Sequence, residues 1–116
     1  MLNLLEREWV LYIANPYGTT SILKAIDKDK VAVARAYLSV NDKFNKKKGR
    51  GIAQSRMRNF WELYKNAGVV EYFSAPENNV YDMPGHILFE VVNPNKLFAE
   101  EKQFWENVIL PRFDSK

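Results

Sequence analysis

The residues best suited to chemistry in this chain of 116 residues are basic and lie close together. Between positions 43 and 58 there are seven basic residues and no acidic one, although the net charge of the chain is only +3. They are Lys43, Lys46, Lys47, Lys48, Arg50, Arg56 and Arg58. Such a segment attracts polyanions, because each phosphate that it neutralises releases a condensed counterion. It predicts nucleic-acid binding, with a solvated lysine loop as the alternative.

The basic segment leads into a predicted amphipathic helix over about residues 52–67. At about 100° per residue, its apolar side carries Ala53, Met57, Phe60, Trp61, Tyr64 and Ala67. Its polar side carries Gln54, Ser55, Arg58, Glu62 and Lys65. Gly68 suits the left-handed position that follows a helix, and Val69 and Val70 then begin a strand. One side of the helix is therefore expected to pack, and the other to contact a partner.

Catalytic and metal-binding patterns are not found. His86 is the only histidine, which excludes histidine triads and sites with several histidines, and the absence of cysteine excludes thiolate sites. Asp27 and Asp29 lack the further ligands of a calcium or magnesium motif, and residues 49–51 are too short for a phosphate loop. We expect a binding protein, with no catalytic residues, no metal and no cofactor.

Length and composition fit one domain with an ordinary core, since 47% of the residues are hydrophobic and 27% are charged. No apolar run approaches the roughly 20 residues of a membrane helix. The first residues lack the pattern of a signal peptide. A cytoplasmic protein that does not contact a membrane is expected.

The order of these features resembles the winged helix-turn-helix DNA-binding family. The resemblance lies in the Gly51-Ile52 turn, the polar helix opening at residues 53–55, Arg58 with the apolar face around it, and the Asn-Ala-Gly-Val-Val-Glu run at residues 66–71. It implies a mainly helical α+β fold with a core over residues 20–92, in which residues 52–67 form the recognition helix. A two-stranded hairpin, residues 69–73 and 87–92, would form the wing. The polar residues 41–50 depart from the compact helix that usually precedes recognition.

The remaining segments are predicted to be helical. Apolar spacing indicates an N-terminal helix within residues 1–15, helices near 21–26 and 28–41, and a C-terminal helix at 95–110 that Asn95 would cap. The N- and C-terminal helices are assigned to a homodimer interface, with packing on their own domain as the alternative.

The leading hypothesis is a dimeric, sequence-specific protein that binds double-stranded DNA as a transcriptional regulator or as an accessory factor of replication or a mobile element. Gln54, Ser55 and Arg58 would face base edges in the major groove. Phosphates would be held by Lys46, Lys47, Lys48 and Arg50, and Arg56 would serve either role. The alternative is an interaction module, such as an inhibitor encoded by a virus or plasmid, that does not bind DNA. Binding of RNA or single strands, through Phe44, ranks lowest.

Overall fold

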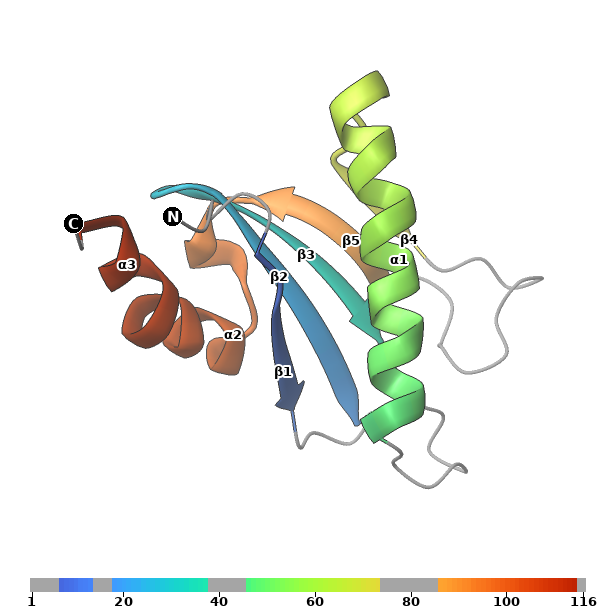
Figure 1. Cartoon of the computed structure of the whole chain (residues 1–116), viewed down its shortest axis with the longest axis horizontal. Helices are drawn as coiled ribbons and strands as arrows, with labels where there is room; N and C mark the ends of the chain where they lie inside the picture. The colour runs from blue at the N-terminus through green and yellow to red at the C-terminus, as the bar shows by residue number, and fades with distance from the viewer. Residues whose placement is uncertain (1–6, 14–17, 38–45, 74–85, 115–116) are drawn as a thin grey trace.

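Five antiparallel strands in the order β1-β2-β3-β5-β4 form the centre of the molecule. The computed structural model describes residues 7–13, 18–37, 46–73 and 86–114. The strands are β1 (Trp9–Ile13), β2 (Thr19–Asp27), β3 (Lys30–Ala36), β4 (Glu71–Phe73) and β5 (Ile87–Val92). A long helix, α1 (Lys46–Ala67), lies on one face of the sheet, and the C-terminal helices lie on the other (Figure 1).

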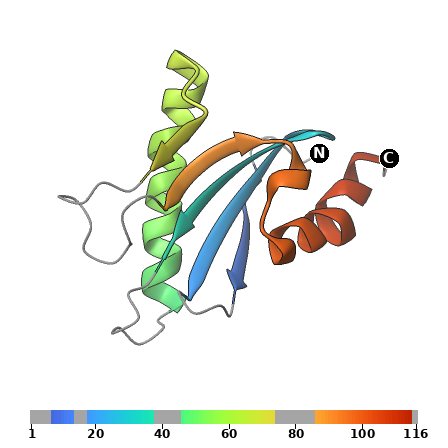
Figure 2. The same ribbon diagram turned by 180° about the vertical axis from the view of Figure 1, so that it is seen from behind.

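The C-terminal segment is a short 3₁₀ turn followed by one helix with a widened middle. It comprises η3 (Pro94–Lys96), α2 (Ala99–Phe104), the π-helical turn η4 (Trp105–Ile109) and α3 (Leu110–Asp114). The Leu110 N–H donates to the Trp105 carbonyl, five residues back. Pro111 explains the widening, because proline has no N–H and its ring crowds the preceding turn of a regular α-helix. Seen from behind, this segment again lies across the sheet from α1 (Figure 2).

Two apolar clusters hold the three layers together, one on each face of the sheet. The cluster under the C-terminal helices is formed by Trp9, Leu23, Ala25, Val31, Val33, Leu97, Trp105 and Ile109. The cluster under α1 is formed by Ile22, Ala32, Ala34, Ala36, Ala53, Met57 and Phe89. Because β2 and β3 contribute to both clusters, these two central strands are buried on both faces.

Strand β3 shows how the sequence sets the spacing of the layers. Its valines, Val31 and Val33, face the C-terminal helices, whereas Ala32, Ala34 and Ala36 face α1. Small residues under a helix let its backbone approach the sheet closely. Gly49 of α1 permits this close approach, because a Cβ atom at this position would lie 2.5 Å from Oγ1 of Thr20 on β2.

The structure corrects the prediction of helices in the first 41 residues. Within the described ranges, residues 9–13, 19–27 and 30–36 are strands, and the Asp27 to Lys30 segment, predicted to separate two helices, is a tight turn between β2 and β3. A strand covered on both faces reads as a continuous apolar run, so the period-2 alternation that marks a half-buried strand is lost. The predicted parts at residues 1–6, 14–15 and 38–41 lie outside the described residues.

The winged helix-turn-helix fold class is also wrong. The chain is dominated by a five-stranded sheet, and the helix at residues 52–67 is part of a longer helix that packs on this sheet. The predicted hairpin is confirmed as a pair, since β4 and β5 are antiparallel neighbours. It is no free wing, however, because β5 also pairs with β3 and joins the hairpin to the central sheet.

Of the two terminal helices predicted for a dimer interface, the structure shows only the C-terminal one among the described residues. Residues 9–13 form no helix, while the predicted helix at residues 95–110 corresponds to the C-terminal helical segment that begins at Pro94. Its cap is Asn93, whose side chain accepts a hydrogen bond from the Asn95 N–H. Its apolar residues pack on the chain's own sheet, and the homodimer stays a prediction. Among the described residues, no helix has both the length and the apolar character needed to cross a membrane.

Candidate nucleic-acid interface

Helix α1 presents the predicted site, and its packing decides which side chains face outward. Ala53 and Met57 are buried against the sheet, and Phe60, Trp61 and Tyr64 pack around them, as predicted. Ala67, predicted on the same face, is exposed because the helix there is near its end. Gly68 has a φ of 69° and donates its N–H to the Tyr64 carbonyl, which confirms it as the glycine that ends the helix.

The outer face of α1, which we define as Lys47, Lys48, Arg50, Gly51, Gln54 and Arg58, is exposed. It contains four basic residues and no acidic residue. The first acidic residue of the helix is Glu62, whose carboxylate lies 3.1 Å from the Lys65 ammonium. The basic half of the helix thus begins at its N-terminal end, where the helix dipole is also positive. This part of the surface favours an anionic partner.

Arg56 does not belong to this outer face. It is half-buried, and its Nη1 donates a 2.7 Å hydrogen bond to the Arg35 carbonyl of β3. Ser55 is half-buried as well. Lys46 is the first residue of α1, but its side chain lies outside the described residues, as does all of Lys43. Of the eight predicted DNA-binding residues, five therefore lie exposed on one face: Lys47, Lys48, Arg50, Gln54 and Arg58.

One basic residue beside α1 was missed by the sequence analysis. Lys24 of β2 places its ammonium 4.5 Å from the centre of the Trp61 ring and 3.8 Å from the Glu8 carboxylate. Its side chain is almost buried. The only signal in the sequence is a lysine inside the apolar run of residues 22–26. These contacts assign Lys24 to the attachment of α1 to the sheet.

A second cluster of charged residues lies on the opposite face, between the sheet and α2. Arg35 donates Nε and Nη2 to the two carboxylate oxygens of Glu101, at 2.9 and 2.7 Å, and Nη1 to Glu90 at 2.6 Å. Ser21 and the Phe98 N–H also donate to Glu101. The Phe98 ring lies 4.0 Å from the guanidinium. Arg35 and Glu101 are fully buried, and their hydrogen bonds connect α2 to β2 and β3.

The surroundings of this cluster shift two pKa values. Burial alone lowers the pKa of Arg35, but the hydrogen bonds and charge of Glu101 more than offset this effect and raise the pKa above its ordinary value. Burial raises the pKa of Tyr37 to about 12, although the charge of Arg35 acts in the other direction. The Tyr37 hydroxyl donates to the Ile87 carbonyl at 2.9 Å, which also requires its proton. Both groups keep their protons at neutral pH.

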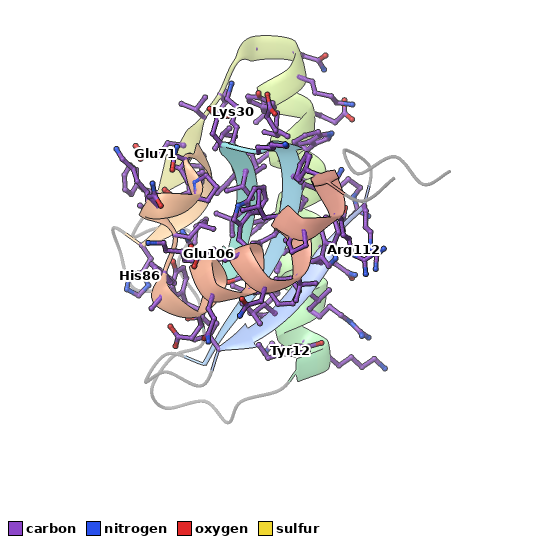
Figure 3. The ribbon with its side chains drawn as sticks, turned by 90° about the vertical axis from the view of Figure 1, so that its left-hand side faces the viewer. Tyr12, Lys30, Glu71, His86, Glu106 and Arg112 are labelled. Carbon is purple, nitrogen blue, oxygen red and sulfur yellow. The ribbon has the colours of Figure 1, made fainter. Side chains whose placement is uncertain are left out.

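The side of the molecule that carries the C-terminal helices differs from α1 in charge. Figure 3 shows this side, with Glu106 and Arg112 on the helical segment, and the sheet between it and α1. A pocket beside it is lined by groups of both signs, among them Lys28, Asp29, Lys102 and Glu106. In the part of the chain that the structure describes, no three acidic or histidine side chains gather where they could hold a metal ion. The concentrated charge of one sign lies on α1.

Four exposed apolar residues lie near the other end of α1. We define the edge patch as Leu63, Val70, Tyr72 and Phe73, whose exposed fractions are 44%, 50%, 40% and 46%. It combines the last turns of α1 with the outer strand β4, and the Tyr72 ring packs 4.5 Å from the Phe60 ring. Exposed apolar residues beside a sheet edge are typical of contacts with another protein.

Comparison of the chain with protein families, with characterised proteins and with solved structures finds no match. The surface chemistry of α1 and of the edge patch therefore provides the indications of function.

Proposed function

We propose that this protein binds double-stranded DNA through the outer face of α1. The observation that carries the proposal is the sign and placement of charge on this helix. Lys47, Lys48, Arg50 and Arg58 are exposed on the basic outer face, while the opposite side of the same helix is buried in the sheet. A transcriptional regulator or an accessory factor of replication or a mobile element remains the biological role that we expect for such a protein.

The sheet supports this role because α1 packs on it through the buried residues Ala53 and Met57. From Lys47 to Arg58 the helix advances about 17 Å, which is enough to follow several phosphates along one strand. The major groove is about 12 Å wide and admits an α-helix. Gln54 and Arg58 are one turn apart on the outer face, where glutamine suits adenine and arginine suits guanine. The lysines and Arg50 would contact phosphates beside them.

The test is fluorescence anisotropy of a labelled random-sequence duplex at several salt concentrations. We expect log affinity to fall linearly with log salt, with a slope of about −3 or steeper if four basic residues neutralise phosphates. The variant with Lys47, Arg50 and Arg58 all changed to Ala should flatten this slope by about 2 to 3.

A matched control separates the position of the charge from its amount. The variant with Lys30, Lys96 and Arg112 changed to Ala loses the same three charges from exposed positions outside α1. This control variant should bind the duplex with nearly the same affinity as the unchanged protein. No binding of the unchanged protein at low salt would overturn the proposal, as would equal losses in the two triple variants.

The edge patch supports a second candidate function, that of a protein-interaction module. Its four apolar residues lie at the end of α1 away from the basic outer face, so they would contact a partner without DNA. Capture of protein partners by the unchanged protein and by a Leu63→Ser, Tyr72→Ser double variant distinguishes this function from DNA binding. The second function would be favoured if the unchanged protein captures a partner that the double variant does not capture, and if the unchanged protein has no affinity for duplex.

A further inference from the structure

Gly51 lies in the middle of the basic outer face, and the packing of the protein does not require a glycine there. Among the residues that the structure describes, a Cβ atom at Gly51 would meet nothing within 4 Å, in contrast to Gly49, where it would collide with Thr20. The φ of Gly51 is not positive, so its backbone conformation suits any residue. An exposed glycine inside a helix is less favourable than alanine, because it loses more backbone conformational freedom on folding. The fold alone therefore gives no reason for the missing side chain.

The neighbours of Gly51 on the helix surface are all polar. Residues three and four positions away lie next to a helical residue. For Gly51 these are Lys47, Lys48, Gln54 and Ser55. Lys47, Lys48 and Gln54 are exposed and Ser55 is half-buried. The missing side chain leaves open space on the helix surface between these four residues, and we call this position the Gly51 notch.

All four side chains around the Gly51 notch have groups that can donate a hydrogen bond, and two of them carry positive charge. A phosphate group offers acceptor oxygens and negative charge, so it matches this set. Glycine lets a nucleic-acid backbone approach the helix more closely than any other residue does, which shortens every contact around it.

We propose that the Gly51 notch seats a phosphate group of the DNA backbone and that Gly51 is the point where the duplex approaches α1 most closely. This inference rests on the proposed DNA binding and adds the contact that positions the duplex. The notch holds one phosphate of the strand, while Arg58, two turns further along α1, lies beside the adjoining part of the groove.

The test fills the notch without changing the charge. Gly51→Ala and Gly51→Gln add side chains of increasing size, and both residues favour helix more than glycine does. We expect the affinity for the random-sequence duplex to fall about fivefold for Gly51→Ala and about twentyfold or more for Gly51→Gln, the range for a lost charge-assisted hydrogen bond. The salt slope of Gly51→Gln should be flatter by about 1, because one phosphate contact is lost.

Thermal stability provides the readout that a purely structural role of Gly51 would not give. The melting temperature should rise by about 3 °C in both variants, because the helix gains propensity without a clash. Asn66→Gln, at an exposed position 15 residues away on the same helix, is the control and should leave the affinity unchanged.

The outcomes separate this inference from the proposed function. If the unchanged protein binds duplex and Gly51→Gln binds equally tightly, the notch proposal is wrong while DNA binding stands. If the unchanged protein does not bind duplex at low salt, both proposals fail. Weaker binding with a lowered melting temperature would also contradict the notch, because the loss would then come from damage to the helix.

Discussion

At the scale of single residues, Glu101 shows how a buried charge is accommodated. Its two carboxylate oxygens accept four hydrogen bonds, two of them from Arg35 and the others from Ser21 and the Phe98 N–H. The last of these also satisfies a free N–H at the start of α2. A buried ion pair adds little net stability when intact, but the loss of one partner leaves an uncompensated charge. Glu101 therefore joins the C-terminal helices to β2 and β3 in one arrangement.

We predict that Glu101→Gln lowers the free energy of unfolding by about 3 kcal/mol, because Arg35 would keep a buried charge with fewer acceptors. Urea unfolding followed by tryptophan fluorescence measures the loss. Glu100→Gln is the matched control, because Glu100 is exposed next to Glu101 and should change the value by less than about 0.5 kcal/mol. Similar values for the two variants would show that the cluster does not contribute as described.

We also predict a loss of stability at alkaline pH that depends on Tyr37. The pKa of Tyr37 is raised to about 12 in the folded protein, against about 10 when unfolded. Below pH 10 both states keep the proton. Between pH 10 and 12 the unfolded chain releases it first, so the free energy of unfolding falls by up to about 2 kcal/mol as the pH rises. In Tyr37→Phe this part of the slope should be absent, and urea titrations at pH 9 to 12 compare the two. Parallel curves would contradict the assignment.

At the scale of elements, the two glycines near the start of α1 have different surroundings. Gly49 lets the helix approach β2, whereas Gly51 is open to solvent on the other side. Their neighbour Ala53 is buried over the alanines of β3, so the first turns of α1 lie close against the sheet. This closeness fixes the direction in which the basic outer face points.

We predict that Gly49→Ala destabilises the protein by about 1 to 3 kcal/mol, although alanine favours a helix more than glycine does. The new Cβ atom would lie 2.5 Å from Thr20 Oγ1, and one of the two elements must shift. Thermal unfolding of Gly49→Ala, Thr20→Ala and the double variant measures the coupling. The double variant should recover part of the loss, because the colliding oxygen is gone. A gain in stability for Gly49→Ala alone would contradict the close contact.

At the scale of the whole molecule, the two outer layers protect the sheet unequally. Strands β2 and β3 are covered on both faces, whereas all three residues of the edge strand β4 are exposed. The sheet therefore has a covered centre behind the basic part of α1 and an exposed edge beside the last turns of α1. The proposed DNA contact lies on the helix over the covered strands, and the edge patch lies beside the exposed strand β4.

We predict that hydrogen exchange follows this difference. Hydrogen-bonded amides of β2 and β3 should exchange only through global unfolding, while those of β4 should exchange at least about a hundredfold faster through local opening. Exchange measured by nuclear magnetic resonance gives the rates for each residue. Equal protection of β4 and β3 would indicate that the edge is covered by a second molecule, and a repeat at lower protein concentration would test this explanation.

The sequence by itself determined the elements whose patterns are local. The period of apolar residues and Gly68 located the helix at 52–67 and its end, and turn residues located the hairpin of β4 and β5. The apolar spacing after Pro94 located the C-terminal helices. The basic segment was found from its clustered charge, and the helical period placed Gln54 and Arg58 on the exposed side, but the helical state of residues 46–51 was left open. These features need no distant residue to define them.

Only the tertiary structure decided the rest. Residues 9–13, 19–27 and 30–36 form strands because helices cover both faces of the sheet, and this burial removes the alternation by which a strand is recognised. Arg35 and Glu101 are 66 positions apart, so no local pattern pairs them. Arg56, one of eight predicted DNA-binding residues, turned inward because the Arg35 carbonyl lies within its reach. Contacts between distant segments decide such outcomes, and the spacing of residues along the chain does not contain them.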